Sequence, residues 1–110
     1  MNSFEWLGNV LANIGSYPMR ARALYVEEGA PFDVKARTMV LEHDLYSDEL
    51  PEAAQRFALR RTLSVLDASG VVENARRQKP DVSPAELVQA FNFYWKRDAF
   101  IDFSRLNGSK

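Results

Sequence analysis

The sequence predicts an α+β fold, in which about four helices pack on a mainly antiparallel sheet of about three strands. We expect a single small domain over residues 1–110, because this length suffices for one hydrophobic core and is too short for two. Hydrophobic residues make up 46% of the chain and charged residues 26%, as in ordinary globular domains. The predicted elements follow the order helix, strand, strand, helix, strand, helix, helix, which lacks the regular alternation of a doubly wound fold.

The amino-terminal half is predicted to hold one helix and two strands. A helix capped by Ser3 should end at Gly15, because apolar residues recur within it at three- and four-residue steps. Gly8 costs this helix about 1 kcal/mol relative to alanine, so the helix should depend on packing. Alternating side chains predict a strand over residues 20–28, and an apolar centre predicts a covered strand over residues 37–42. Neighbouring strands joined by roughly eight to ten residues most simply form an antiparallel hairpin with a long loop.

Three further elements are predicted in the second half. A short helix over residues 51–57 begins with a proline, which suits the first helical turn. Residues 61–66 alternate as a third strand does. Asp67 or Ser69 should then cap a helix that Pro80 ends.

The last predicted helix has the best-defined start in the chain. Ser83 and Glu86 have the spacing of a capping box, and Pro84 takes the first helical position. Its apolar face, expected in the core, carries Leu87, Val88, Phe91, Tyr94 and Trp95. Three more aromatic residues lie on another side of the helix or beyond its end, namely Phe93, Phe100 and Phe103. These three are expected to pack under the sheet or to form a surface for dimerisation or partner binding.

The residues provide no recognisable catalytic or metal-binding set. Cysteine is absent, which removes disulfides, thiolate ligands and thiol nucleophiles together. His43 is the only histidine, and its neighbours Glu42 and Asp44 cannot both join it on one side of a strand. No serine lies in a Gly-x-Ser-x-Gly turn, and the glycines form no phosphate-binding loop. We therefore expect no enzyme, no cofactor and no metal site.

An acidic segment is the candidate partner-binding site. Five acidic residues lie between residues 42 and 52 without any lysine or arginine, and they surround one tyrosine. Such a segment attracts a basic partner, although it also suits a solvated loop and the start of a helix. The residues assigned to binding are Asp44, Tyr46, Asp48, Glu49 and Glu52.

Two alternatives remain open beside a protein-binding role. A nucleic-acid-associated regulator would use Arg56, Arg60, Arg61, Arg76 and Arg77. The formal net charge of −1 gives no general attraction to nucleic acid, and these arginines lie on separate predicted elements. A small homodimer would instead bury Phe93, Phe100 and Phe103.

The amino terminus does not resemble a signal peptide, because Glu5, Asn9 and Asn13 interrupt its apolar residues. No apolar run approaches the roughly 20 residues that span a bilayer. We expect a cytoplasmic protein without a membrane partner.

The carboxy-terminal third resembles a family of small, mostly uncharacterised bacterial proteins. The segments that carry the resemblance are Val-Glu-Asn-Ala at 72–75, Gln-Lys-Pro at 78–80, Ala-Glu-Leu at 85–87, Ala-Phe-Asn-Phe-Tyr at 90–94 and Asp-Ala-Phe-Ile at 98–101. That family includes immunity proteins of contact-dependent growth inhibition or polymorphic toxins. The resemblance implies a cytoplasmic, non-enzymatic protein that binds and blocks a toxin domain. The acidic segment would attract a basic toxin domain.

Overall fold

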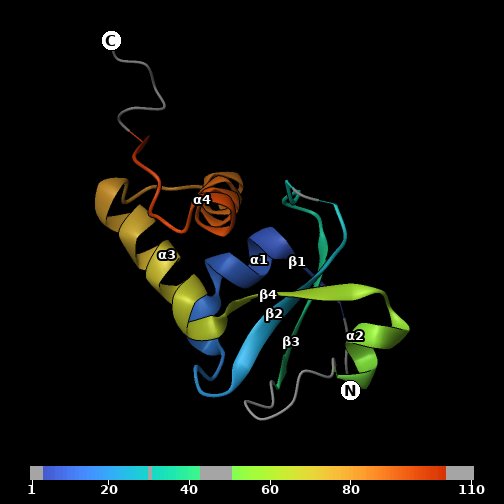
Figure 1. Cartoon of the computed structure of the whole chain (residues 1–110). Coiled ribbons are helices and arrows are strands. Elements are labelled where there is room, and N and C mark those ends of the chain that lie inside the picture. Colours follow the sequence, from blue (N-terminus) through green and yellow to red (C-terminus); the bar gives the residue numbers. More distant parts are fainter. Residues whose placement is uncertain (1–3, 30, 43–50, 104–110) are drawn as a thin grey trace.

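The computed structural model describes residues 4–29, 31–42 and 51–103. Along the chain it contains β1 (Glu5–Trp6), α1 (Leu7–Ala12), the 3-10 helix η1 (Ile14–Ser16), β2 (Arg22–Glu27), β3 (Arg37–Glu42), α2 (Glu52–Arg56), β4 (Leu59–Ser64), α3 (Val65–Gln78) and α4 (Pro84–Arg97). Figure 1 shows these elements in sequence colours.

The strands form one antiparallel sheet in the order β1-β3-β2-β4. The predicted hairpin of β2 and β3 is confirmed, with Leu24 opposite Val40. The α+β class is therefore confirmed, and the described sheet has four strands where about three were expected. The additional strand is β1, whose two residues pair with β3.

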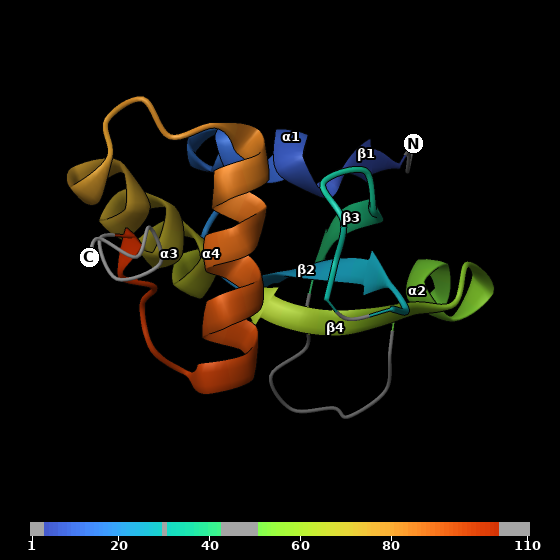
Figure 2. The same cartoon turned by 90° about the horizontal axis from the view of Figure 1, so that it is seen from above.

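The two faces of the sheet are covered unequally. Helices α1, α3 and α4 gather on one side, whereas α2 lies at the other side of the sheet (Figures 1 and 2). The alternation predicted in β2 separates the two cores: Leu24 and Val26 belong to the large helical core, and Ala23 and Tyr25 belong to a smaller core with Ala54 of α2.

Helix α1 starts later than the sequence predicted and without a side-chain cap. Ser3 lies outside the described residues, and the N-cap residue is Trp6. The backbone N–H groups of Leu7 and Gly8 donate instead to the carbonyls of Ala36 and Val34, each at 2.9 Å. An added Cβ at Gly8 would collide with Val34, so glycine permits this close approach.

The junction of β4 and α3 also differs from the prediction. The strand covers residues 59–64, two residues earlier than expected, and α3 follows it directly. The hydroxyl of Ser64 caps α3 by accepting a 3.0 Å hydrogen bond from the backbone N–H of Asp67. The predicted caps Asp67 and Ser69 are therefore wrong, because both lie inside the helix.

Helix α4 begins as predicted and is followed by a returning tail. The capping box of Ser83 and Glu86 is complete, with bonds of 2.9 and 3.2 Å between each side chain and the other residue's N–H. The helix ends at Asp98, which has a left-handed backbone with φ of 56°. Ile101 and Phe103 then return into the large core.

Candidate functional site

Of the residues assigned to the predicted acidic site, the structure describes only Glu52. Outside the described residues lie His43, Asp44, Tyr46, Asp48 and Glu49. Glu52 is exposed at the start of α2, where the positive end of a helix favours a carboxylate. It lines a small hollow with Arg56 and Phe57, on the side of the sheet that carries the smaller core.

A groove follows the solvent side of α4, beside the loop that joins β2 and β3. It consists of two hollows of about 510 and 370 Å³, which share Pro31 on the loop and Gln89 and Asn92 on α4. The larger hollow is mainly apolar and is also lined by Phe93, Trp95, Lys96 and Ile101. We call both hollows together the α4 groove.

Asn92 holds the loop against the helix at this groove. Its side-chain carbonyl accepts a 2.7 Å hydrogen bond from the backbone N–H of Phe32, and its amide donates a 2.8 Å bond to the carbonyl of the same residue. One side chain thereby satisfies both backbone groups of Phe32, as a neighbouring strand would. The chain's own hydrogen bonds consequently fix the loop wall of the α4 groove.

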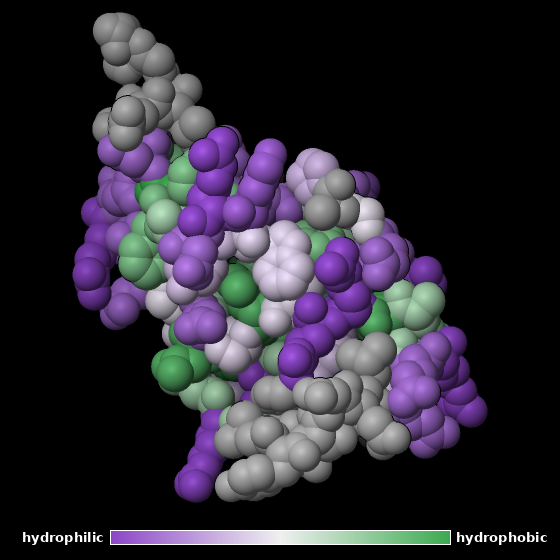
Figure 3. Space-filling view, in the orientation of Figure 1, coloured by the Kyte–Doolittle hydropathy of each residue, from purple (hydrophilic) through white to green (hydrophobic). Residues whose placement is uncertain are grey.

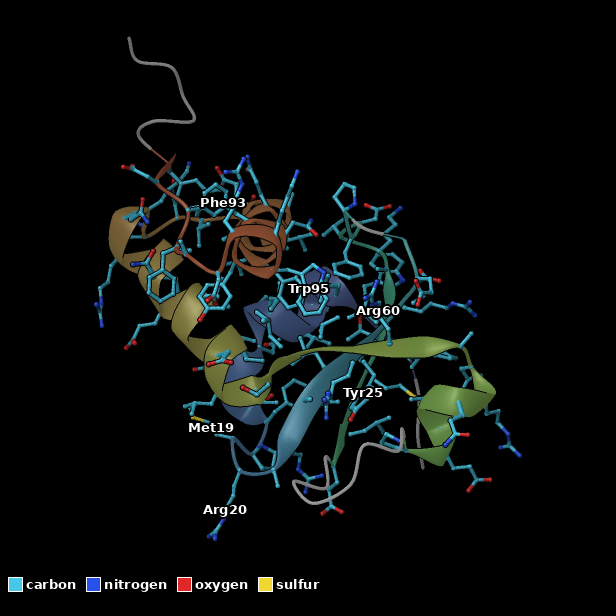
Figure 4. The ribbon with its side chains drawn as sticks, viewed as in Figure 1. Met19, Arg20, Tyr25, Arg60, Phe93 and Trp95 are labelled. Carbon is cyan, nitrogen blue, oxygen red and sulfur yellow. The ribbon has the colours of Figure 1, made fainter. Side chains whose placement is uncertain are left out.

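Trp95 lies where α4, the loop and β4 meet. Its ring centroid is 6.3 Å from that of Phe32, and the guanidinium of Arg60 lies 5.5 Å from the Trp95 ring. Arg60 also forms an ion pair with Glu28 at 3.7 Å. Figure 4 shows Trp95 between α4 and β4, with Arg60 beside it on the strand. In the same orientation, Figure 3 shows apolar and weakly polar surface at this seam, flanked by hydrophilic surface.

Residues 4–103 match the sequence model of a protein family, DUF7716, which is described as a domain of unknown function. This range includes every element of the α4 groove. This chain belongs to that family. No curated protein matches the chain, and neither does any solved structure.

The aromatic tail of the DUF7716 domain divides between core and surface. Phe103 is 7% exposed, whereas Phe100 is 49% exposed and packs on Tyr94 with ring centroids 5.5 Å apart. Phe93 is partly buried and lines the α4 groove. A dimer interface could therefore use Phe100 and the outer part of Phe93, but Phe103 is already covered within its own chain.

A side-chain amide also holds the tail in place. The Gln78 amide donates a 2.6 Å hydrogen bond to the carbonyl of Ile101, and its carbonyl accepts a 3.0 Å bond from the N–H of Phe103. Like Asn92, Gln78 of α3 uses one amide to bond a backbone carbonyl and a backbone N–H, here of two different residues. Both irregular segments that flank the groove are thus fixed by an amide on a helix.

The basic residues of the DUF7716 domain do not converge on one face. Arg60 and Arg61 are neighbours on β4 and therefore point to opposite sides of the sheet. Arg76 donates a 2.9 Å hydrogen bond to the carbonyl of Ala12, and Arg77 pairs with Glu73 at 3.4 Å. Arg76 and Arg77 thus both make contacts within the chain.

The perturbed titratable groups have structural causes. Hydrogen bonds from the Ser83 backbone, and secondarily Lys79, hold the pKa of Glu86 below its ordinary value. Burial raises the pKa of the Tyr25 phenol, and the hydrogen-bonded guanidinium of Arg61 offsets part of that rise. Within the described ranges no cluster of three His, Cys, Asp or Glu residues could hold a metal ion, and no helix is long and apolar enough to cross a membrane.

Sequence reasoning missed the groove because its decisive residues lie far apart along the chain. Trp95 was expected in the core, but it is only partly buried. Asn92 is a polar residue among aromatic ones on α4, and this position was the one available signal of a specific hydrogen-bonding role. Its partner Phe32 lies 60 residues away and follows no recognisable pattern.

Proposed function

We propose that this chain is a non-enzymatic protein-binding domain that holds its partner in the α4 groove. The observation that carries the proposal is the combination, in one groove, of mainly apolar walls with a partly exposed tryptophan beside an arginine. Tryptophan and arginine are the residue types that most often dominate the binding energy of protein interfaces.

The rigidity of the groove supports this role. Asn92 fixes the loop wall, and Trp95 is held between Phe32 and Arg60. Binding to prearranged side chains costs less conformational entropy than binding to side chains that must first become ordered. Phe93 and Pro31 extend the apolar area on either side of this anchor.

We further propose, from the resemblance of the carboxy-terminal third, that the partner is a bacterial toxin domain and that the chain acts as its immunity protein. The acidic segment would then attract a basic toxin through Asp44, Asp48, Glu49 and Glu52, with Tyr46 as an aromatic anchor. Charged groups outside the buried contacts mainly raise the association rate through attraction at a distance, whereas buried apolar contacts slow dissociation. The two surfaces therefore make separable contributions.

The test is a pull-down from host lysate treated with nuclease, with the tagged wild-type chain beside two tryptophan variants. Trp95→Ala removes the groove anchor, and Trp6→Ala is the matched control because Trp6 is 50% exposed and lies outside the groove. We expect one protein to be retained in stoichiometric amount by wild type and Trp6→Ala, and to be lost with Trp95→Ala. Thermal unfolding of each variant checks that the fold is kept.

A retained toxin domain should lose its toxicity when it is expressed together with this chain. Association of the chain with that toxin domain should slow when Asp44, Asp48 and Glu49 are replaced by lysine. Equal retention by Trp95→Ala and wild type would remove the α4 groove from the proposal. Recovery of nucleic acid, with an affinity that falls steeply as salt is added, would favour the regulator that uses the arginines.

A further inference from the structure

Another hollow, of about 610 Å³, lies between η1 and α3 and shares no lining residue with the α4 groove. Its walls include Gly15 and Met19 on one side and Leu66, Gly70, Arg76 and Arg77 of α3 on the other. We call it the α3 groove. Figure 4 places Met19 beside the start of α3, and Figure 3 shows hydrophobic surface in that region.

Two large apolar side chains of the α3 groove are open to solvent. Leu66 is 61% exposed and Met19 is 47% exposed. Leu66 occupies the first turn of α3 yet lies outside the core, so its side chain adds little to the stability of the fold. Adjacent exposed apolar side chains in a hollow are typical of surfaces that a partner covers.

The two glycines of this groove are not required by the fold. Neither Gly15 nor Gly70 has a positive φ, and an added Cβ at either position would meet no atom within 4 Å. Glycine inside a helix is less favourable than alanine, so Gly70 weakens α3 without a packing reason in the described chain. The absence of a side chain at Gly70 leaves open space beside α3 at this groove.

The charge at the α3 groove is mainly positive. Arg76 donates to the neutral carbonyl of Ala12, so this bond leaves its charge unbalanced. Arg77 is balanced by Glu73, the one acidic residue that lines the groove. An occupant with carboxylates at its edges would therefore be favoured over a basic one.

We propose that the α3 groove is a second docking surface, which binds an acidic amphipathic helix of another protein. Apolar side chains at three- and four-residue steps would cover Leu66 and Met19, and the helix backbone would approach Gly70. Carboxylates on the flank of that helix would reach Arg76. This surface differs in place and in charge preference from the one proposed for a basic toxin, so each can be tested while the other is unoccupied.

The test uses a synthetic 16-residue peptide with leucine at three- and four-residue steps and glutamate and alanine elsewhere. A second peptide has lysine in place of each glutamate. Each is titrated into the ¹⁵N-labelled full chain, and the backbone amides are followed by NMR. We expect saturable shifts of the Gly15 and Gly70 amides with the acidic peptide and none with the basic peptide.

Two variants make the result specific. Gly70→Leu fills the groove and should weaken acidic-peptide binding by about tenfold or more, because the added side chain occupies the space that the helix needs. Trp6→Ala, at an exposed residue that lines neither groove, should leave this affinity unchanged. The proposal would be overturned if the acidic peptide gave no saturable shift, or gave shifts confined to Gln89 and Asn92 of the α4 groove. Equal binding of both peptides would also overturn it, and so would undiminished binding to a folded Gly70→Leu chain.

Discussion

Asn92 shows how much of this molecule depends on a single side chain. It pairs with both backbone groups of Phe32, at the loop that forms one wall of the α4 groove. The loop has no strand beside it there, so the amide supplies bonds that a sheet would otherwise supply. Asparagine is specific for this task because it carries one donor group and one acceptor side by side.

Replacing Asn92 by alanine should lower the free energy of unfolding by about 1–3 kcal/mol, because two partly buried backbone groups lose their partner. Urea denaturation of wild type and variant measures the difference. Gln89→Ala is the control, since Gln89 is exposed one turn earlier on the same helix and should change stability by less than about 0.5 kcal/mol. Equal effects of both changes would contradict the bridging role.

Glu27 should make the stability depend on pH. It accepts hydrogen bonds from the backbone N–H of Arg37 at 2.9 Å and from its Nε at 3.1 Å, and these hold the pKa of Glu27 below its ordinary value of 4.5. The stabilisation is therefore complete well above pH 4.5 and is lost as the pH falls below 4.5 through the lowered pKa.

Comparison with Glu27→Gln isolates this titration. The excess stability of wild type over the variant, measured by urea denaturation, should be largest near neutral pH and should decrease at about pH 3. A difference that stays constant over this range would show that the Glu27 carboxylate is not responsible.

At the scale of elements, the sequence was informative wherever local rules decide the structure. The capping box of Ser83 and Glu86, the alternation in β2 and the hairpin are all as predicted. The prediction failed where contacts with a distant segment of the chain determine the local structure. Strand β1 exists only through its pairing with β3, and α1 is capped by carbonyls some 28 residues further along the chain.

The start of α3 illustrates a second cause of error. Apolar and polar residues continue to alternate past the end of β4, so the pattern predicted two further strand residues. Ser64 ends the strand and caps the helix at once, which leaves no turn residues to mark the boundary. The candidate site was less predictable, because the α4 groove combines α4 with a loop that no sequence pattern connects to it.

The glycines of α1 and α3 should respond in opposite ways to replacement by alanine. Gly8→Ala should destabilise the fold, because the added methyl group would collide with the side chain of Val34. Gly70→Ala should raise the free energy of unfolding by up to about 1 kcal/mol, since the position is open and alanine favours a helix. Thermal unfolding of both variants tests the pair, and a loss of stability at Gly70 would refute the unstrained environment described for it.

For the whole molecule, the tail after α4 closes the large core. Ile101 and Phe103 are buried, and Gln78 of α3 binds the backbone on both sides of Asp102. The final segment therefore connects α3 with α4, two helices that also contact each other directly. The domain depends on residues near the end of the family match as much as on its strands.

Two phenylalanines of the tail allow a matched test. Phe103→Ala should cost about 3–5 kcal/mol of stability, because it leaves a cavity in the core. Phe100→Ala should change stability far less, since that ring is 49% exposed. Urea denaturation measures both changes in stability.

Light scattering of Phe100→Ala and wild type tests the homodimer alternative, which requires a lower molecular mass in solution for this variant.

Strand β4 lies at an edge of the sheet, where the strand of a second molecule could add by backbone pairing. Its consecutive arginines, Arg60 and Arg61, present a cation on each face of that edge. A copy of β4 aligned against it would bring like charges together on both faces, which disfavours the stacked strands of amyloid. The arginine beside the groove tryptophan should thus also disfavour strand addition at this edge.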